Sequence, residues 1–294
     1  MTPIIQKTDS HHSYNNLLAE PLYTILKNNR LAMESLRHTF LKAINSAGQQ
    51  SAYVSPALLN DFNSLPELLQ KFFHQCGYTG FEQIECAHIK WNETMLKLSP
   101  KAKWSPMHCY QVNFLSQPIR LAYMKISIFG LLPLEALDLY KDAQGSMSIK
   151  LMKIIPVGNT TGKEIDASEL VTILAETMII PHYALQKYIT WEVIDASSIK
   201  GTINYAGISV SGIFHFNQNA ECTRFVTQDR YLTKKNNKYQ KTSWTATATD
   251  YMLKNGVRFP TKFSATWNTD NSDYEYFKGT IKSIEFNKTE ISGI

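Results

Sequence analysis

A long series of strand-like segments, interrupted by one helical segment, most strongly constrains the fold of this chain. Between residues 120 and 128 every second residue is apolar, which is typical of a β-strand with one apolar face. These apolar residues are Ala122, Met124, Ile126 and Ile128. Similar segments, separated by turn residues such as Asp142–Gly145, continue to residue 286, and one of the predicted strands runs from Cys222 to Leu232. The pattern predicts about five strands before the helix and seven after it, in an antiparallel meander.

The helical segment is marked at both ends. Asp166 and Glu169 have the spacing of a capping box, and Pro181 ends the helical pattern. We therefore predict a helix over about 167–179, with a buried stripe that includes Leu170 and Leu174. An antiparallel sheet must cover one of its faces. The predicted fold is α+β, mainly antiparallel β, with a curved half-barrel sheet wrapped around this helix.

The start of the chain has a different pattern. Residues 1–60 read as a helical N-terminal extension, and residues 61–294 as the half-barrel domain. The stripe of Met33, Leu36, Phe40 and Ile44 recurs at helical spacing. Such amphipathic helices can dock on the chain's own domain or on a partner, and docking on the domain is the more economical interpretation.

Composition excludes several classes of protein. The chain of 294 residues has 30 Lys and Arg against 25 Asp and Glu, a net charge of +5 that is mild for its length. We therefore expect no nucleic-acid partner. No phosphate-binding glycine loop, HExxH or GxSxG motif occurs, and we expect no cofactor. The N-terminus lacks a secretory pattern, and no apolar stretch could span a bilayer. We expect a soluble, cytoplasmic protein without an integral membrane segment.

The four cysteines, Cys76, Cys86, Cys109 and Cys222, contain no CxxC pair, so we expect reduced thiols. Cys86 and His88 could meet His108 and Cys109 in a zinc site. However, His108 and Cys109 point to opposite faces of a strand, so four ligands would need a distorted strand. We therefore predict no metal site.

An ordered set of short motifs covers residues 65–287. The set includes Leu65-Pro66, Asp138-Leu-Tyr140, Leu174-Ala-Glu176, Trp191–Asp195, Phe214-His-Phe216, Gly256–Thr261 and Tyr276–Gly279. Together these motifs resemble a widespread bacterial family of domains of unknown function. The resemblance implies a fold like that of the LolA/LppX-like lipoprotein carriers, an incomplete antiparallel barrel around a helix. It implies no catalytic residues, because the family has no established activity.

Glu176 is the main candidate for a functional polar residue. It lies on the helix that the sheet should cover, and a buried carboxylate needs a partner. We predict Arg230 as that partner. The pair could be a structural ion pair, the polar end of an apolar cavity, or a general acid/base at Glu176.

Aromatic residues on strands suggest what the cavity would hold. Trp191, Phe214, Phe216, Trp244 and Trp267 could form an ordinary core or line a ligand cavity. Our leading hypothesis is a non-enzymatic protein that binds a lipid or another apolar small molecule between sheet and helix. The alternative is a small-molecule hydrolase or isomerase that uses Glu176.

Overall fold

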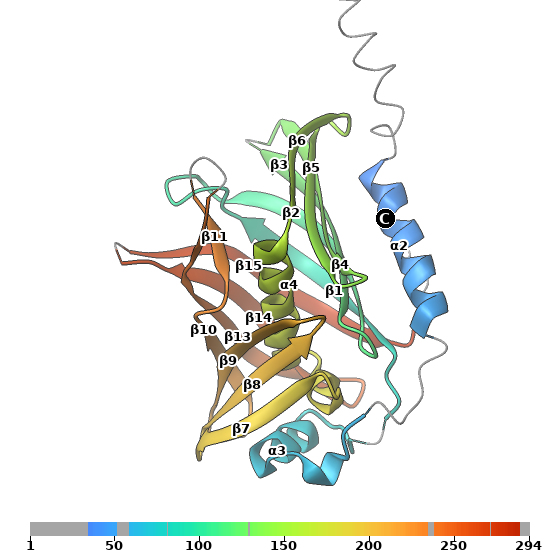
Figure 1. Ribbon diagram of the computed structural model, residues 1–294, viewed down its shortest axis with the longest axis vertical. Helices are drawn as coiled ribbons and strands as arrows, with labels where there is room; N and C mark the ends of the chain where they lie inside the picture. The colour runs from blue at the N-terminus through green and yellow to red at the C-terminus, as the bar shows by residue number, and fades with distance from the viewer. Residues whose placement is uncertain are drawn as a thin grey trace, which may run out of the picture. The chain divides into compact units, whose positions relative to one another are not determined.

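The computed structural model describes residues 35–51, 59–80, 82–128, 130–234, 238–270 and 272–288. Residues Leu36–Ile294 form one compact unit. In its described part, thirteen strands make a single sheet in the order β6-β5-β4-β3-β2-β1-β15-β14-β13-β10-β9-β8-β7. Every neighbouring pair is antiparallel, and strands β6 and β7 are unpaired edges. The sheet is therefore open, and it curves around helix α4 (Figure 1). The predicted fold class is confirmed.

The elements before the first strand are α2 (Leu36–Ser51), η3 (Phe62–Ser64) and α3 (Glu67–Gln75). The first half of the sheet comprises β1 (Cys86–Leu96), β2 (Ser105–Phe114), β3 (Ile119–Ile128), β4 (Leu132–Lys141), β5 (Gln144–Leu151) and β6 (Ile155–Thr161). Helix α4 (Lys163–Ala175) and the short η4 (Glu176–Met178) and η5 (Pro181–Leu185) then lead to the other edge. The second half comprises β7 (Ile189–Asp195), β8 (Ser198–Tyr205), β9 (Ile208–Phe216), β10 (Cys222–Thr227), β13 (Ser243–Lys254), β14 (Val257–Asn268) and β15 (Asp273–Phe286). Between β10 and β13 the chain forms β11 (Tyr231–Thr233) and β12 (Tyr239–Lys241), which are not part of this sheet.

Helix α4 starts earlier than the capping box predicts. Its N-cap is Gly162, whose φ of 119° is a backbone conformation that favours glycine. The Asp166 carboxylate instead accepts a hydrogen bond of 2.6 Å from the backbone N–H of Gly145. Asp166 therefore ties the helix to the β4–β5 hairpin. The α-helix ends at Ala175, and a 3₁₀ turn continues to Met178.

Helix α4 is buried on all sides from Ala167 onward. Leu170, Val171, Ile173 and Leu174 are fully buried, although they point in different directions around the helix. A helix with apolar residues in all these directions is stable only where its surroundings cover it. The curved sheet provides this cover, because α4 contacts strands from both halves, including β5 and β9. The predicted buried stripe is confirmed, but burial extends beyond it.

Helix α2 covers the outer face of the sheet. Its stripe of Leu36, Phe40 and Ile44 is buried against Val112, Leu121, Tyr123 and Leu137 of strands β2–β4. These strand residues alternate with those that face α4, so the two helices lie on opposite faces of the same strands (Figure 1). This part of the extension docks on the domain, as expected. The predictions for residues 1–34 and 52–58 lie outside the described residues.

The predicted strand from Cys222 to Leu232 is wrong, because it is two strands. Strand β10 ends at Thr227, whose hydroxyl accepts a hydrogen bond from the backbone N–H of Asp229. The Asp229 carboxylate then accepts from the backbone N–H of Ser211 at 2.9 Å. The chain leaves the main sheet here, and β11 pairs with β12 in a separate hairpin. This exit carries Arg230 over helix α4.

The β4–β5 hairpin contains a strained residue that offers a first test. Asp142 and Ala143 form its two-residue turn with φ of 53° and 61°, the left-handed conformation of a type I′ turn. We expect Ala143→Gly to raise the free energy of unfolding by about 1 kcal/mol, since glycine adopts this conformation without a steric penalty. Chemical denaturation measures the change. Ala102→Gly, in a turn outside the left-handed region, should not stabilise the protein; equal stabilisation by both changes would contradict the explanation.

Candidate ligand-binding cavity

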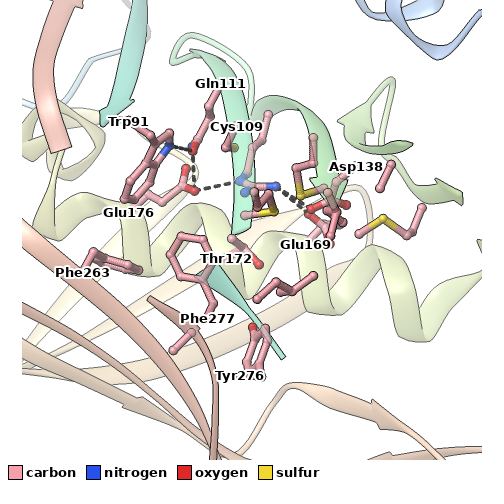
Figure 2. Close-up of a pocket in the computed structure, with 18 of the residues that line it drawn as sticks. Trp91, Cys109, Gln111, Asp138, Glu169, Thr172, Glu176, Phe263, Tyr276 and Phe277 are labelled. Carbon is pink, nitrogen blue, oxygen red and sulfur yellow. Dashed lines mark hydrogen bonds and ion pairs between the residues drawn. The ribbon is translucent and has the colours of Figure 1, made fainter. Parts of the chain in front are cut away.

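A cavity of about 240 Å³ lies between the inner face of the sheet and helix α4 (Figure 2). Most of its wall is apolar and is contributed by strands β1–β5, β14 and β15. These apolar wall residues include Trp91, Leu96, Met107, Met124, Ile126, Leu134, Met147, Ile149, Phe263, Ala265 and Phe277. A smaller part of the wall is charged, and it comprises Arg120, Asp138, Glu169, Glu176 and Arg230.

Strand register arranges this wall in rows across β2, β3, β4 and β5. One row places Gln111, Ala122, Asp138 and Met147 side by side. The next row, two residues along each strand, is Cys109, Met124, Ala136 and Ile149, and the row after it is Met107, Ile126, Leu134 and Leu151. The wall therefore changes from polar to apolar in the direction of the β3–β4 hairpin.

Arg120 of β3 is the centre of the charged end. Its Nε lies 2.7 Å from Glu176 Oε1, and its Nη1 lies 2.7 Å from Asp138 Oδ2 and 3.5 Å from Glu169 Oε2. The Arg120 side chain is only 11% exposed. Burial opposes its charge, but the carboxylates of Glu176, Asp138 and Glu169 outweigh this effect and raise the pKa of Arg120. Arg120 thus joins strands β3 and β4 to helix α4 and its 3₁₀ end.

Glu176 is held by neutral donors as well as by Arg120. Gln111 Nε2 donates to Glu176 Oε1 at 2.8 Å, and Asn113 Nδ2 donates to Oε2. Gln111 is itself oriented by Trp91, whose Nε1 donates to Gln111 Oε1 at 3.2 Å (Figure 2). Both carboxylate oxygens of Glu176 are therefore engaged within the protein.

The predicted ion pair between Glu176 and Arg230 is wrong. Arg230 Nη1 instead donates to Ser168 O at 3.1 Å and to the Thr172 hydroxyl, at least one turn of α4 before Glu176. The Arg230 guanidinium lies over the rings of Trp244, at 4.6 Å, and Trp267, at 5.6 Å. The early end of strand β10 gives Arg230 this position. Its Nε has no hydrogen-bond partner among the described residues.

Sequence reasoning missed Arg120 and Asp138 as members of this cluster, although a signal was present. Arg120 continues the alternation of Ala122 and Met124, so it lies on the apolar face of its strand. Asp138 likewise continues the alternation of Leu134 and Ala136 along its strand. A charged residue on an apolar strand face requires a buried partner. Two such residues on neighbouring strands indicate a pair.

Glu169 and Asp138 each leave one oxygen without a hydrogen-bond partner in the described structure, Oε2 of Glu169 and Oδ1 of Asp138. Both residues are buried and line the cavity. Burial, and next the charge of Asp138, raise the pKa of Glu169 to about 8, although Arg120 and Arg230 oppose the shift. The raised pKa favours the neutral, protonated form of Glu169 near neutral pH. With Glu169 neutral, two arginines balance two carboxylates.

The aromatic residues proposed as cavity lining do not all lie there. Trp244 lines the cavity with Glu176 and Arg230. Trp191 and Phe214 instead pack over Gly201 with Leu174, and a Cβ on Gly201 would lie within 3.1 Å of all three side chains. Phe216 contacts Phe72 of helix α3, with ring centroids 5.6 Å apart. Helix α4 fills that half of the barrel, so these residues form core. Trp267 stacks on Tyr276 beside the cavity without lining it.

Within the described residues, no group of three or more His, Cys, Asp or Glu side chains is placed to hold a metal ion. None of the helices in the described part of the chain is both long enough and apolar enough to span a membrane.

Comparison with known proteins gives a family match for most of the chain. The family of unknown function DUF6920 matches residues 63–286. No curated protein matches the chain. Among solved structures, a LolA superfamily protein of Nitrosomonas europaea and a DUF1329 family protein of Desulfovibrio piger are similar at 8% identity. Each similarity covers 75% of this chain and has a TM-score of 0.38. It covers 94% of the Nitrosomonas protein and 91% of the Desulfovibrio protein. Because this match includes the whole half-barrel and its charged cluster, the chain belongs to the DUF6920 family.

Proposed function

We propose that this protein binds one apolar small molecule of the lipid class in the cavity between sheet and helix α4. The observation that supports the proposal is the combination of an apolar wall with a buried charged end in which Asp138 Oδ1 and Arg230 Nε have no hydrogen-bond partner among the described residues. Buried polar atoms usually have a partner. A ligand whose apolar body fills the wall and whose polar end reaches this cluster would supply one.

The size of the cavity favours a ligand with one chain. Its volume of about 240 Å³ exceeds the roughly 150 Å³ of an engineered apolar cavity that accepts benzene. It is smaller than the roughly 300–1,000 Å³ of pockets that bury drug-sized ligands. The proposed ligand is therefore a single acyl or prenyl chain rather than a whole two-chain lipid.

The charged end favours an uncharged polar group on the ligand. At neutral pH the arginines and ionised carboxylates balance once Glu169 is protonated. Arg230 Nε can donate one hydrogen bond, and Asp138 Oδ1 can accept one. A hydroxyl group can both accept and donate, so it satisfies both atoms. A ligand carboxylate or ammonium would add an unbalanced buried charge.

We do not propose the enzyme alternative for Glu176. A general base needs an oxygen directed at the substrate. Both oxygens of Glu176 are already engaged by Arg120, Gln111 and Asn113.

Binding of three probes of equal chain length tests the proposal. Dodecanol, dodecanoate and dodecylamine would be titrated into the protein at neutral pH by calorimetry, with native mass spectrometry to give the stoichiometry. We expect one dodecanol to bind at least about tenfold more tightly than either charged probe. Tightest binding of dodecanoate would overturn the choice of end group. Absence of binding by all three, in protein freed of co-purified lipid, would overturn the proposed function.

Variants that fill the cavity locate the binding site. Ala136 of β4 and Ala265 of β14 are buried and line the cavity from separate strands. We expect Ala136→Leu and Ala265→Leu each to weaken dodecanol binding at least about tenfold, because the added side chain occupies the ligand's space. Thr266→Leu, at the next position on β14, is the matched control and should bind as the unmodified protein does. Equal loss in the control would place binding elsewhere.

A further inference from the structure

An exposed apolar surface borders the apolar end of the cavity. Three hairpins, β1–β2, β3–β4 and β5–β6, turn back at the same end of neighbouring strands, because successive strands in this half of the sheet are adjacent and antiparallel. We call their exposed apolar residues the rim, and these are Leu98, Leu131, Leu132, Met152, Ile154 and Ile155. Leu131 is 84% exposed and Ile154 is 68% exposed. Exposed apolar residues grouped in this way indicate an interaction surface.

The rim is continuous in space and with the cavity. The backbone N–H of Met152 donates to Pro133 O at 2.8 Å, so the β3–β4 and β5–β6 turns are joined. Leu98 belongs to the rim and also lines the cavity, together with Leu96, Ile126 and Leu134 from the same ends of the strands. The cavity wall that begins at the charged cluster therefore ends at the exposed apolar rim.

The charged residues within the three hairpins are all lysines. Lys97, Lys101 and Lys103 lie between strands β1 and β2, and Lys150 and Lys153 flank the β5–β6 turn. Residues 96–106, 127–133 and 150–157, which cover the three hairpins, contain no Asp or Glu. Trp104 lies among them, with the Nζ atoms of Lys97 and Lys278 at 4.9 and 4.6 Å from its ring centroid. The acidic residues at this end, Asp270, Asp273 and Glu275, lie on the β14–β15 turn and the start of β15, outside the three hairpins.

We propose that the rim docks on an anionic lipid bilayer. Exposed leucine and isoleucine side chains can enter the boundary of the acyl chains, while the lysines contact acidic headgroups. Tryptophan is also favoured at the membrane interface. This orientation directs the apolar end of the cavity at the bilayer. The occupant of the rim is the membrane surface, and the hairpins lie on it without crossing it.

Vesicle flotation with the full chain tests the proposal. Phosphatidylcholine vesicles would be compared with vesicles that also contain about 30 mol% phosphatidylglycerol. We expect binding to the anionic vesicles to be at least about tenfold tighter, and to weaken at about 0.5 M NaCl because salt screens the lysines. Leu131→Ser with Ile154→Ser should reduce binding about tenfold, since both side chains lose their contact with the lipid. Lys101→Glu should reduce it about fivefold or more.

The matched control uses the opposite ends of the strands. Val193 and Leu253 are also highly exposed, Leu253 at 65%, but lie on the β7–β8 and β13–β14 hairpins. Val193→Ser with Leu253→Ser should leave vesicle binding unchanged. Equal loss in this control, or no binding of the unmodified protein to either vesicle, would overturn the proposal. Dimerisation in sedimentation experiments that Ile154→Ser abolishes, without vesicle binding, would assign the rim to a second copy of the chain.

Vesicle binding is independent of the proposed ligand. Ala136→Leu fills the cavity and leaves the rim intact, so it should bind anionic vesicles as the unmodified protein does while it loses dodecanol. Loss of vesicle binding in this variant would show that the rim does not act as a separate surface. If only dodecanol binding failed, the proposed function would be overturned, and the proposal that the rim binds membranes would be unaffected.

Discussion

Replacing Arg120 by methionine is expected to lower the free energy of unfolding by about 4 kcal/mol, because it leaves buried carboxylates without their cation. Asp138, Glu169 and Glu176 all lie within 3.5 Å of the Arg120 guanidinium. Methionine keeps much of the side-chain volume, so the loss reports charge rather than packing. Urea denaturation followed by tryptophan fluorescence measures the change.

A double variant tests whether the carboxylates cause this loss. Glu176→Gln removes one of the unpaired charges, so Arg120→Met with Glu176→Gln should be about 2 kcal/mol more stable than the sum of the single changes implies. Arg230→Met is the matched control, because Arg230 bonds to Ser168 and Thr172 rather than to a carboxylate. We expect it to cost about 1 kcal/mol. Strict additivity of the Arg120 and Glu176 changes would contradict the structure of the cluster.

The contribution of Glu169 to the stability of the protein is expected to fall as the pH rises from about 4.5 to about 8. Its pKa is raised from 4.5 to about 8 by burial and by Asp138. In this range the unfolded chain has released the Glu169 proton, whereas the folded protein retains it. The stabilisation is therefore complete below the unfolded pKa and lost as the pH approaches the folded pKa. A shift of this size corresponds to a loss on the order of 4 kcal/mol between these two pH values.

Glu169→Gln removes this contribution, because glutamine stays neutral at every pH. Relative to the variant, the unmodified protein should lose stability as the pH rises from about 4.5 to about 8. Burial lowers the pKa of His182 to about 4, and this contribution cancels because both proteins share it. Glu164→Gln, on the first turn of the same helix, is the matched control and should keep the slope. Parallel pH profiles for the unmodified protein and Glu169→Gln would show that Glu169 ionises normally in the fold. Denaturation midpoints at several pH values supply the comparison.

The same titration bears on ligand binding. Ionisation of Glu169 above pH about 8 would give the cluster a net negative charge beside the ligand's polar end. An ammonium ligand would then be favoured over an alcohol, so the preference among the three dodecyl probes should move toward dodecylamine as the pH approaches 9 or so. In Glu169→Gln the preference should not change with pH over this range.

Much of the architecture could be predicted from local patterns. The alternation along Arg120–Ile128, a hairpin turn within Asp142–Gly145 and the apolar character of Leu170–Leu174 each follow from side-chain period and residue type. A sheet with one apolar face and one embedded helix has few ways to bury both. The half-barrel around α4 was therefore accessible from the sequence, as was the packing of Leu36, Phe40 and Ile44 as a helical stripe.

The partners within the charged cluster depended on tertiary structure. Glu176 was identified from its place on a buried helix. The residue that pairs with it was decided by the register of β3 against β2 and β4, which places Arg120 beside Asn113 and Tyr140. Arg230 was excluded because Thr227 and Asp229 end strand β10 and move the chain onto another turn of α4. Periodicity reports which face a residue takes and carries no information on which distant residue lies opposite. The sequence by itself therefore determined the sheet, the helix and the need for a buried ion pair. Strand register and the break in β10 decided which residues form that pair, because contacts between distant segments depend on how the whole chain packs.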